Sequence, residues 1–497
     1  MPSVRRNAIA NLFGGGWAAV MGLAFVPLYI KYMGVEAYGL VGVFISLQAI
    51  FAVLDMGLSQ TLAREMARLS VSSGANRQMA DTARTLEVIY WLFALLVGGG
   101  LAFGAHFIAN YWLKPDQLST ESVRHALWIM ALVIVLRWPL TLYIGGMNGL
   151  QRQVLLNGLL AFFATFQGIG AVLVLSLLEP TVEAFFTWQA FSSLLQVLVI
   201  RYGFWHALPV SGGRFSLRVL DGIWRFALGM TGISLLATIL TQLDKLVLSK
   251  MLSLENFGFY VFASTVASVL FRAVSPIFTS YLPRFTQLVS SGDIEALKAN
   301  YRQAGQAMAM ALIPVACLLA VYSDEILMLW TQNKELVENT RILVGILVVG
   351  NMLNGLVNIP YALQVAYGWI RFGLVQNAIA VVLVVPALLF FIGKFDQIGA
   401  AVVWAGLNFL FLVVGVFIMH RTILIGEWTG WLLQSVVYPL LAGGVAVLTA
   451  KALLPVPHGL TQEVLLLFGV SLLVFCAVAI SLPFCRQFVS RSFVRLA

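Results

Sequence analysis

The segment KYMGVEAYG at residues 31–39 recurs at residues 250–258 as KMLSLENFG. A lysine, a glutamate, an aromatic residue and a glycine hold the same four positions in both copies, at an offset of 219 residues. Each copy joins two long apolar segments, the first and second of a block of six. The repeat therefore predicts two parallel blocks of helices with the same internal order.

Composition identifies lipid as the solvent for most of this chain. The 497 residues are 60% hydrophobic and only 10% charged, and their mean hydropathy is +0.92. Soluble domains carry about 25% charged residues, so this chain could not cover a surface that faces water. Apolar runs of about 20 residues recur throughout, which is the length that a helix needs to cross a bilayer. We expect an all-α polytopic membrane protein with about fourteen transmembrane helices. The predicted spans are 7–30, 38–60, 86–112, 124–149, 154–178, 182–202, 221–250, 257–283, 301–330, 343–366, 372–392, 398–420, 431–453 and 464–485.

The distribution of lysine and arginine predicts how the chain is oriented. With the N-terminus inside, 19 of the 30 basic residues fall in cytoplasmic segments, 8 fall outside and 3 lie within spans. This excess follows the positive-inside rule and places both termini in the cytoplasm. The net charge of +9 is spread over short loops and so does not indicate nucleic-acid binding.

The repeat divides the predicted spans into lobes. Residues 1–205 form an N-terminal lobe of helices 1–6, and residues 221–420 form a C-terminal lobe of helices 7–12. A cytoplasmic connection covers 206–220, and residues 421–497 hold helices 13 and 14 and a cytoplasmic tail. Parallel repeats of this kind are related by an axis along the membrane normal.

Charged residues inside the predicted spans are candidates for a binding site, because a charge near the bilayer centre is costly. Arg272 and Arg137 lie near the middle of their spans, and Lys245 lies beside Asp244. Asp55 lies toward the inner part of its span. Three cations against two anions predict a cationic cavity for an anionic ligand, since arginine offers a fork of donors to phosphate oxygens. Asp55 and Asp244 are candidates for ion coupling.

Each of these residues also has a structural alternative. Arg137 could pair with Asp55 and join two helices, and Asp244 could pair with Lys245 near the interface. The stripe Asn351, Asn354 and Asn358 could line a polar cavity or bind helices to each other.

Motifs for catalysis and cofactors are missing. The histidines form no recognisable dyad, there is no Walker motif, and the three cysteines lack the spacing of metal ligands. We expect neither an enzyme nor a metal site nor a bound cofactor. Coupling to a proton or sodium gradient, or to the membrane potential, is the expected energy source.

The N-terminal stretch from NAIANLFGGGW through VEAYG to LDMGLSQTLAREMARL, together with LDKLVLSKMLSLENFGFY, resembles Wzx-type oligosaccharide flippases. These belong to the multidrug/oligosaccharidyl-lipid/polysaccharide exporter superfamily. The resemblance covers about the first 290 residues and the remainder matches only in hydropathy. It implies two helical bundles arranged as a V, as in multidrug exporters of this superfamily, and alternating access around a cationic cavity.

The resemblance also implies a substrate and a location. The substrate would be an undecaprenyl-pyrophosphate-linked oligosaccharide, moved from the cytoplasmic to the periplasmic leaflet of a bacterial inner membrane for surface or exopolysaccharide biosynthesis, including O-antigen. Expected partners are membrane lipids, a polysaccharide polymerase and a chain-length regulator.

Three alternatives remain open at this stage. A multidrug or cation antiporter of the same superfamily would need a cavity rich in carboxylates. A lipid II flippase would share the two additional helices. A membrane-embedded polysaccharide polymerase or ligase would need a large outer loop, and every predicted outer loop is short.

Overall fold

The computed structural model describes residues 4–55, 57–72, 74–210, 212–217, 238–455, 459–484 and 486. All regular structure within these ranges is helical, as predicted. The chain divides into two compact units, Met1–Gly258 and Phe259–Ala497. The boundary falls after the second copy of the repeated turn. The predicted division into lobes at 206–220 stays a prediction, since 211 and 218–237 lie outside the described residues.

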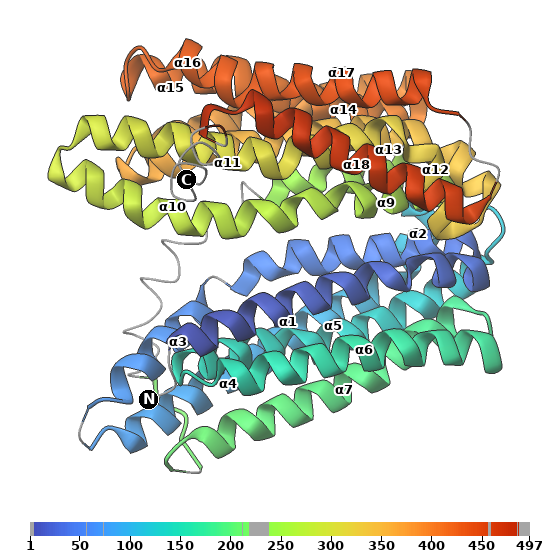
Figure 1. Ribbon diagram of the computed structural model, residues 1–497. Coiled ribbons are helices and arrows are strands. Elements are labelled where there is room, and N and C mark those ends of the chain that lie inside the picture. The colour runs from blue at the N-terminus through green and yellow to red at the C-terminus, as the bar shows by residue number, and fades with distance from the viewer. Residues whose placement is uncertain are drawn as a thin grey trace. The chain divides into compact units, whose positions relative to one another are not determined.

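Unit 1 is a bundle of long helices that pack along their lengths (Figure 1). Contacts join α1 to α6, α4 to α5, and α5 to α7. Ser119 and Thr181 begin α5 and α7 with side-chain caps, because their hydroxyls accept from the backbone N–H groups of Ser122 and Ala184. Residues 238–250 are also helical. The named elements are α1 (Val4–Ala24), α2 (Val26–Ala52), η1 (Val53–Asp55), α3 (Leu58–Leu69), α4 (Asn76–Phe107), η2 (Ile108–Trp112), α5 (Thr120–Gly149), α6 (Gln153–Leu177) and α7 (Val182–Ala207).

The first two predicted spans need one correction. The turn between them is where the sequence placed it, because Gly34 has φ 85° inside α2. The second span ends at Asp55, however, and not at residue 60. Gly57, at φ 70°, starts the separate amphipathic helix α3 in a new direction. Helix α3 buries Leu62 and Met66 against the bundle, an arrangement that a hydropathy window merges with the preceding span.

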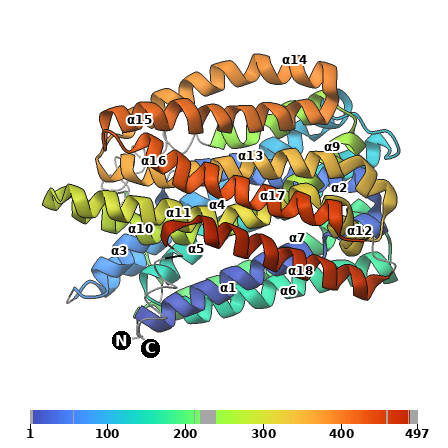
Figure 2. The same ribbon diagram turned by 45° about the horizontal axis from the view of Figure 1, so that its top comes forward.

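Unit 2 contains α10 to α18, and α9 crosses the unit boundary. Contacts join α11 to α13, α17 and α18, so the last two helices pack on the core of this unit (Figure 2). The predicted span 301–330 is divided at Tyr322 into the end of α11 and the short helix α12. The elements are α9 (Leu254–Ala267), η3 (Ser268–Leu270), α10 (Phe271–Ser291), α11 (Ile294–Val321), α12 (Ser323–Thr331), α13 (Lys334–Ala366), α14 (Ile370–Leu410), η4 (Phe411–Gly415), α15 (Val416–Thr422), α16 (Trp428–Leu432), η5 (Leu433–Val437), α17 (Tyr438–Leu453) and α18 (Leu460–Ser481).

Among the described residues, 11 helical segments are long and apolar enough to cross a membrane. One of them, Ile370–Thr422, contains two predicted spans, because Phe395 and Asp396 break the helix. Phe372 and Ile418 line one cavity, so the chain folds back there as a hairpin (Figure 2). The first predicted span corresponds mainly to α1, and the seventh is described only from residue 238. The 11 segments therefore agree with an architecture of about fourteen spans.

Candidate functional site

Arg137 lies near the middle of α5, and neutral oxygens hold its guanidinium in place. Its Nε donates to Ser193 Oγ at 2.9 Å, and its Nη2 donates to Gln189 Oε1 at 2.5 Å and to Gln167 Oε1 at 3.3 Å. The Phe44 ring centre lies 5.6 Å from Cζ. Amide and hydroxyl oxygens fix the orientation of the fork without cancelling its charge.

This arrangement leaves part of the fork unused. Nη1 of Arg137 makes no hydrogen bond within the described part of the chain. Arg137 also lines a cavity of about 220 Å³ in unit 1. Gln196 stabilises the network behind it, accepting from Gln167 Nε2 at 2.9 Å. A cation that lines a cavity inside a membrane span and keeps unused donors is suited to bind an anion.

Asp55 lines the same cavity as Arg137, together with Gln48 and Thr141. Its carboxylate accepts hydrogen bonds from the Tyr90 hydroxyl and, at 2.8 Å, from Ser59 Oγ. The described residues contain no ion pair between Asp55 and Arg137, so the alternative of direct pairing is not observed. Sequence reasoning therefore selected two residues of opposite charge that share one cavity.

Lys245 lies elsewhere in unit 1. It lines a separate, mostly apolar cavity of about 250 Å³, together with Leu47, Trp112 and Ser249. Asp244 precedes it on the same helical segment and is half-buried. The α2 residues at the Lys245 cavity are not those at the Arg137 cavity, so the two predicted cations line different cavities.

Arg272 belongs to unit 2, where its side chain is exposed in the first turn of α10. No hydrogen bond or ion pair within the described ranges fixes its guanidinium. Its role in substrate binding stays a prediction.

The asparagine stripe lies on α13 in unit 2, and two of its three residues join α13 to α14. Asn351 Oδ1 accepts from Trp404 Nε1 at 2.9 Å, and Asn354 Nδ2 donates to Asn408 Oδ1 at 2.8 Å. Asn358 donates to the backbone oxygen of Asn354 at 2.9 Å. The first two contacts favour the helix-joining alternative over a cavity lining for those residues.

Sequence reasoning missed a buried charged centre at Glu87 on α4, which is only 3% exposed. Its carboxylate accepts from Arg84 and Arg201, both at 2.7 Å, and from the Tyr143 hydroxyl and Trp205 Nε1 at 2.7 and 3.1 Å. The signal was present, since Glu87 falls inside the predicted span 86–112. Its partners on α5 and α7 are distant in sequence and could not be anticipated.

A second missed pair lies in unit 2. Both carboxylate oxygens of the buried Glu427 accept from Arg302, each at 2.8 Å. This bidentate contact joins α11 to the segment that precedes α16 and the predicted helix 13.

Comparison with known proteins places these features in a family. Residues 4–289 match the family described as "Polysaccharide biosynthesis protein". The chain belongs to this family. The match spans more than half of the sequence and includes Asp55, Arg137, Lys245 and Arg272. It confirms the resemblance drawn from the N-terminal motifs and both copies of the repeated turn.

Individual relatives agree with this assignment. A Shigella flexneri protein named "Putative O-antigen transporter" is 21% identical over 404 residues, which cover 81% of this chain and 94% of that protein. The lipid II flippase MurJ in an inward closed conformation has a TM-score of 0.71 at 14% identity, covering 97% of this chain and 99% of MurJ. The MATE transporter AtDTX14 has a TM-score of 0.54 at 13% identity, covering 84% and 98%. These structures show that the chain shares the fold of MurJ and of AtDTX14.

Proposed function

We propose that this protein is a flippase that moves polyprenyl-diphosphate-linked oligosaccharides across a bacterial inner membrane. The observation that carries the proposal is Arg137, which lines a cavity within a membrane-spanning bundle and whose Nη1 makes no hydrogen bond within the described residues. Guanidinium groups bind phosphate oxygens through paired donors, which suits a diphosphate headgroup. The family and the named O-antigen relative support the same substrate class.

In this proposal the diphosphate enters the Arg137 site from the cytoplasm, and Lys245 and Arg272 attract it from their own positions. The polyprenyl chain remains in lipid. Each unit of negative charge that leaves the inner face gains about 2.3 kcal/mol per 100 mV of membrane potential. A proton or sodium ion on Asp55 or Asp244 would couple transport to an ion gradient. Alternating access exposes the site to one leaflet at a time.

A cation antiporter is the second candidate, and Asp55 is the observation that favours it. The carboxylate of Asp55 shares the Arg137 cavity and could attract a cation. We prefer the anionic substrate because two hydrogen-bond donors already stabilise that carboxylate, whereas Nη1 of Arg137 is unused.

Complementation of a deletion strain tests the proposal. Loss of the protein should make lipid-linked repeat units accumulate on the inner face. Arg137→Ala should restore export to less than about one tenth of the wild-type rate, the effect of losing a charged hydrogen bond of about 1.5–3 kcal/mol. Arg371→Ala, which removes an exposed arginine at the start of α14, is the matched control and should restore normal export.

Arg272→Ala and Lys245→Ala test the contributions of the other two cations one at a time. Protein levels are measured in every strain. Normal export by both Arg137→Ala and Arg272→Ala at normal protein levels would overturn the proposed cationic site. Accumulation of a cationic drug in the deletion strain, with no change in lipid-linked sugars, would favour the antiporter.

A further inference from the structure

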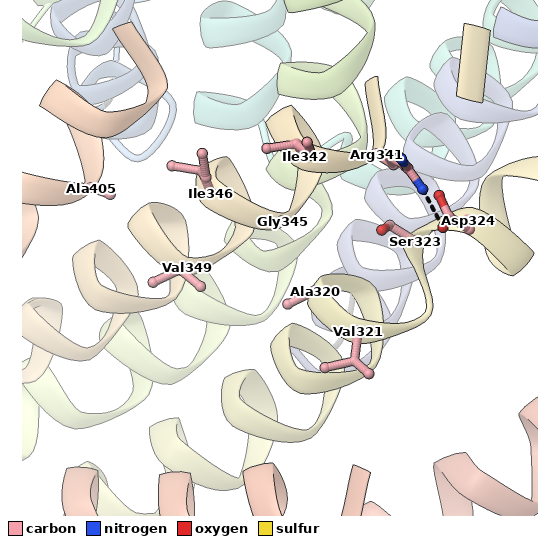
Figure 3. Close-up of a pocket in the computed structure, with 10 residues that line it drawn as sticks. All are labelled: Ala320, Val321, Ser323, Asp324, Arg341, Ile342, Gly345, Ile346, Val349 and Ala405. Atoms are coloured by element: carbon pink, nitrogen blue, oxygen red, sulfur yellow. Dashed lines mark hydrogen bonds and ion pairs between the residues drawn. The ribbon is translucent and has the colours of Figure 1, made fainter. Parts of the chain in front are cut away.

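A cavity of about 520 Å³ lies within unit 2, remote in sequence from the residues proposed to bind substrate (Figure 3). One wall is a stripe on α13 made of Ile342, Gly345, Ile346 and Val349. The end of α11 and Ala405 of α14 supply the facing walls with small or apolar side chains. A polar group of a ligand would lose its water without gaining a hydrogen bond in this part of the cavity, so the lining there suits hydrocarbon.

The other end of the cavity is polar, and Figure 3 shows three side chains there: Ser323, Asp324 and Arg341. Arg341 Nη1 donates to Asp324 Oδ2 at 3.1 Å. Asp324 Oδ1 is buried and has no hydrogen-bond partner. Ser323 is 7% exposed, and its hydroxyl has no partner within the described residues.

Arg341 also retains unused donors, because Nε and Nη2 make no hydrogen bond in the described ranges. The ion pair therefore leaves donors of Arg341 and the acceptor Asp324 Oδ1 next to each other without protein partners. A ligand that satisfies both must offer an anionic acceptor to Arg341 and a hydrogen-bond donor to Asp324 Oδ1, for which a cationic N–H makes the strongest bond to a carboxylate. A phosphate ester that also carries a primary ammonium has both groups.

The dimensions agree with an amphiphile. Arg341 lies about two turns beyond the beginning of α13, and Val349 lies eight residues further, about 12 Å along the helix axis. Half of the hydrocarbon core of a bilayer measures about 15 Å. The polar groups lie near helix ends and the apolar stripe continues toward the middle of the span, as the head and chain of a lipid do.

We infer that this cavity binds an aminophospholipid, phosphatidylethanolamine, with its phosphate on Arg341, its ammonium on Asp324 Oδ1 and one acyl chain along the α13 stripe. The charge distribution of the sequence places this end of the helices in the outer leaflet. The site is distinct from the Arg137 cavity and depends only on the membrane setting, not on the proposed function.

Native mass spectrometry of the full-length protein, released from bilayers of defined composition, tests this inference. Phosphatidylethanolamine should remain bound, whereas phosphatidylcholine, which lacks N–H donors, should be retained about tenfold less, the effect of losing one hydrogen bond to a charged group. Phosphatidylglycerol, which lacks the ammonium, should also be retained less. Undecaprenyl phosphate serves as the probe for an anionic polyprenyl lipid.

Two variants and two matched controls locate the site. Gly345→Leu should place its side chain in the cavity that Gly345 lines, and its Cβ has room, because the nearest atom to an added Cβ is Ala320 O at 3.6 Å. Gly444→Leu on α17 is its control, since an added Cβ there meets nothing within 4 Å. Asp324→Asn removes the acceptor charge, and Glu338→Gln is the control carboxylate on the surface of α13.

The inference predicts loss of bound phosphatidylethanolamine in Gly345→Leu and Asp324→Asn and retention in both controls. Equal retention of phosphatidylglycerol or undecaprenyl phosphate would overturn the assignment to an aminophospholipid. Equal retention by Gly345→Leu and Gly444→Leu would overturn the location.

Discussion

Gly39 lies directly against the backbone oxygen of Leu254, at a distance where a Cβ on Gly39 would come within 2.4 Å of that oxygen. The reciprocal contact joins Gly258 to Val35, where the corresponding distance is 2.3 Å. Adding the repeat offset of 219 residues to Gly39 gives Gly258, and subtracting it from Leu254 gives Val35, so the repeat relates the two contacts. Both contacts lie within unit 1, and they show that the two repeated turns pack against each other with approximate twofold symmetry.

The glutamate of the first turn has a separate role beside this contact. The buried Glu36 carboxylate accepts from the backbone N–H groups of Asp116, Gln117 and Leu118, at 2.6, 2.8 and 3.1 Å. The same loop contacts the second turn, because Lys114 O accepts from Leu254 N at 2.8 Å. The repeated residues are thus structural, and they hold two turns and one loop together.

Gly39→Ala and Gly258→Ala should therefore destabilise the protein. The added methyl group would collide with a backbone oxygen, which cannot rotate away, and overpacking of this kind costs about 1–3 kcal/mol. Thermal unfolding of the detergent-purified protein measures the effect. Gly100→Ala on α4 meets nothing within 4 Å and should unfold at the wild-type temperature. Equal unfolding temperatures for all three variants would mean that the turns are not packed as described.

Glu87→Gln should loosen the inner network of unit 1. The variant removes the charge that Arg84 and Arg201 share, but both arginines are about one third exposed and regain water. We expect a loss of about 1–3 kcal/mol in the free energy of unfolding. Glu65→Gln is the control, because its arginine partners are largely exposed and such pairs contribute less than about 1 kcal/mol. A larger loss in the control would contradict the buried hub.

Asn354→Ala should cost more stability than Asn358→Ala. The first variant leaves the buried Asn408 without its donor inside the membrane, a loss of about 0.6–2 kcal/mol. The second removes only a bond to the backbone of the same helix. Unfolding of the two purified variants compares them directly. If Asn358→Ala instead abolished export with normal stability, that residue would line a transport path.

Arg137→Lys should fail to replace arginine although it keeps the charge. Lysine has a single ammonium and cannot reach Ser193, Gln189 and a ligand with the geometry of a planar fork. We expect export to fall about tenfold or more. Arg421→Lys, an exposed position at the end of α15, should restore normal export. Full export by Arg137→Lys would show that charge alone is sufficient.

The sequence by itself determined the membrane class, the sites of most turns and the repeat. Apolar length is a local property, and a backbone in lipid can satisfy its hydrogen bonds only as helix, so each span follows from its own residues. Gly34 lies at the first turn. The repeated glycines Gly39 and Gly258 lie at the contact between the two turns.

Only the tertiary structure decided which charges meet. Asp55 and Arg137 share a cavity while Lys245 borders another, because these positions depend on how helices distant in sequence pack together. The same reason explains why Glu87 was missed and why Asn351 and Asn354 join α13 to α14. The energy of a charge in a membrane depends on its neighbours in space, and a linear sequence does not specify those neighbours.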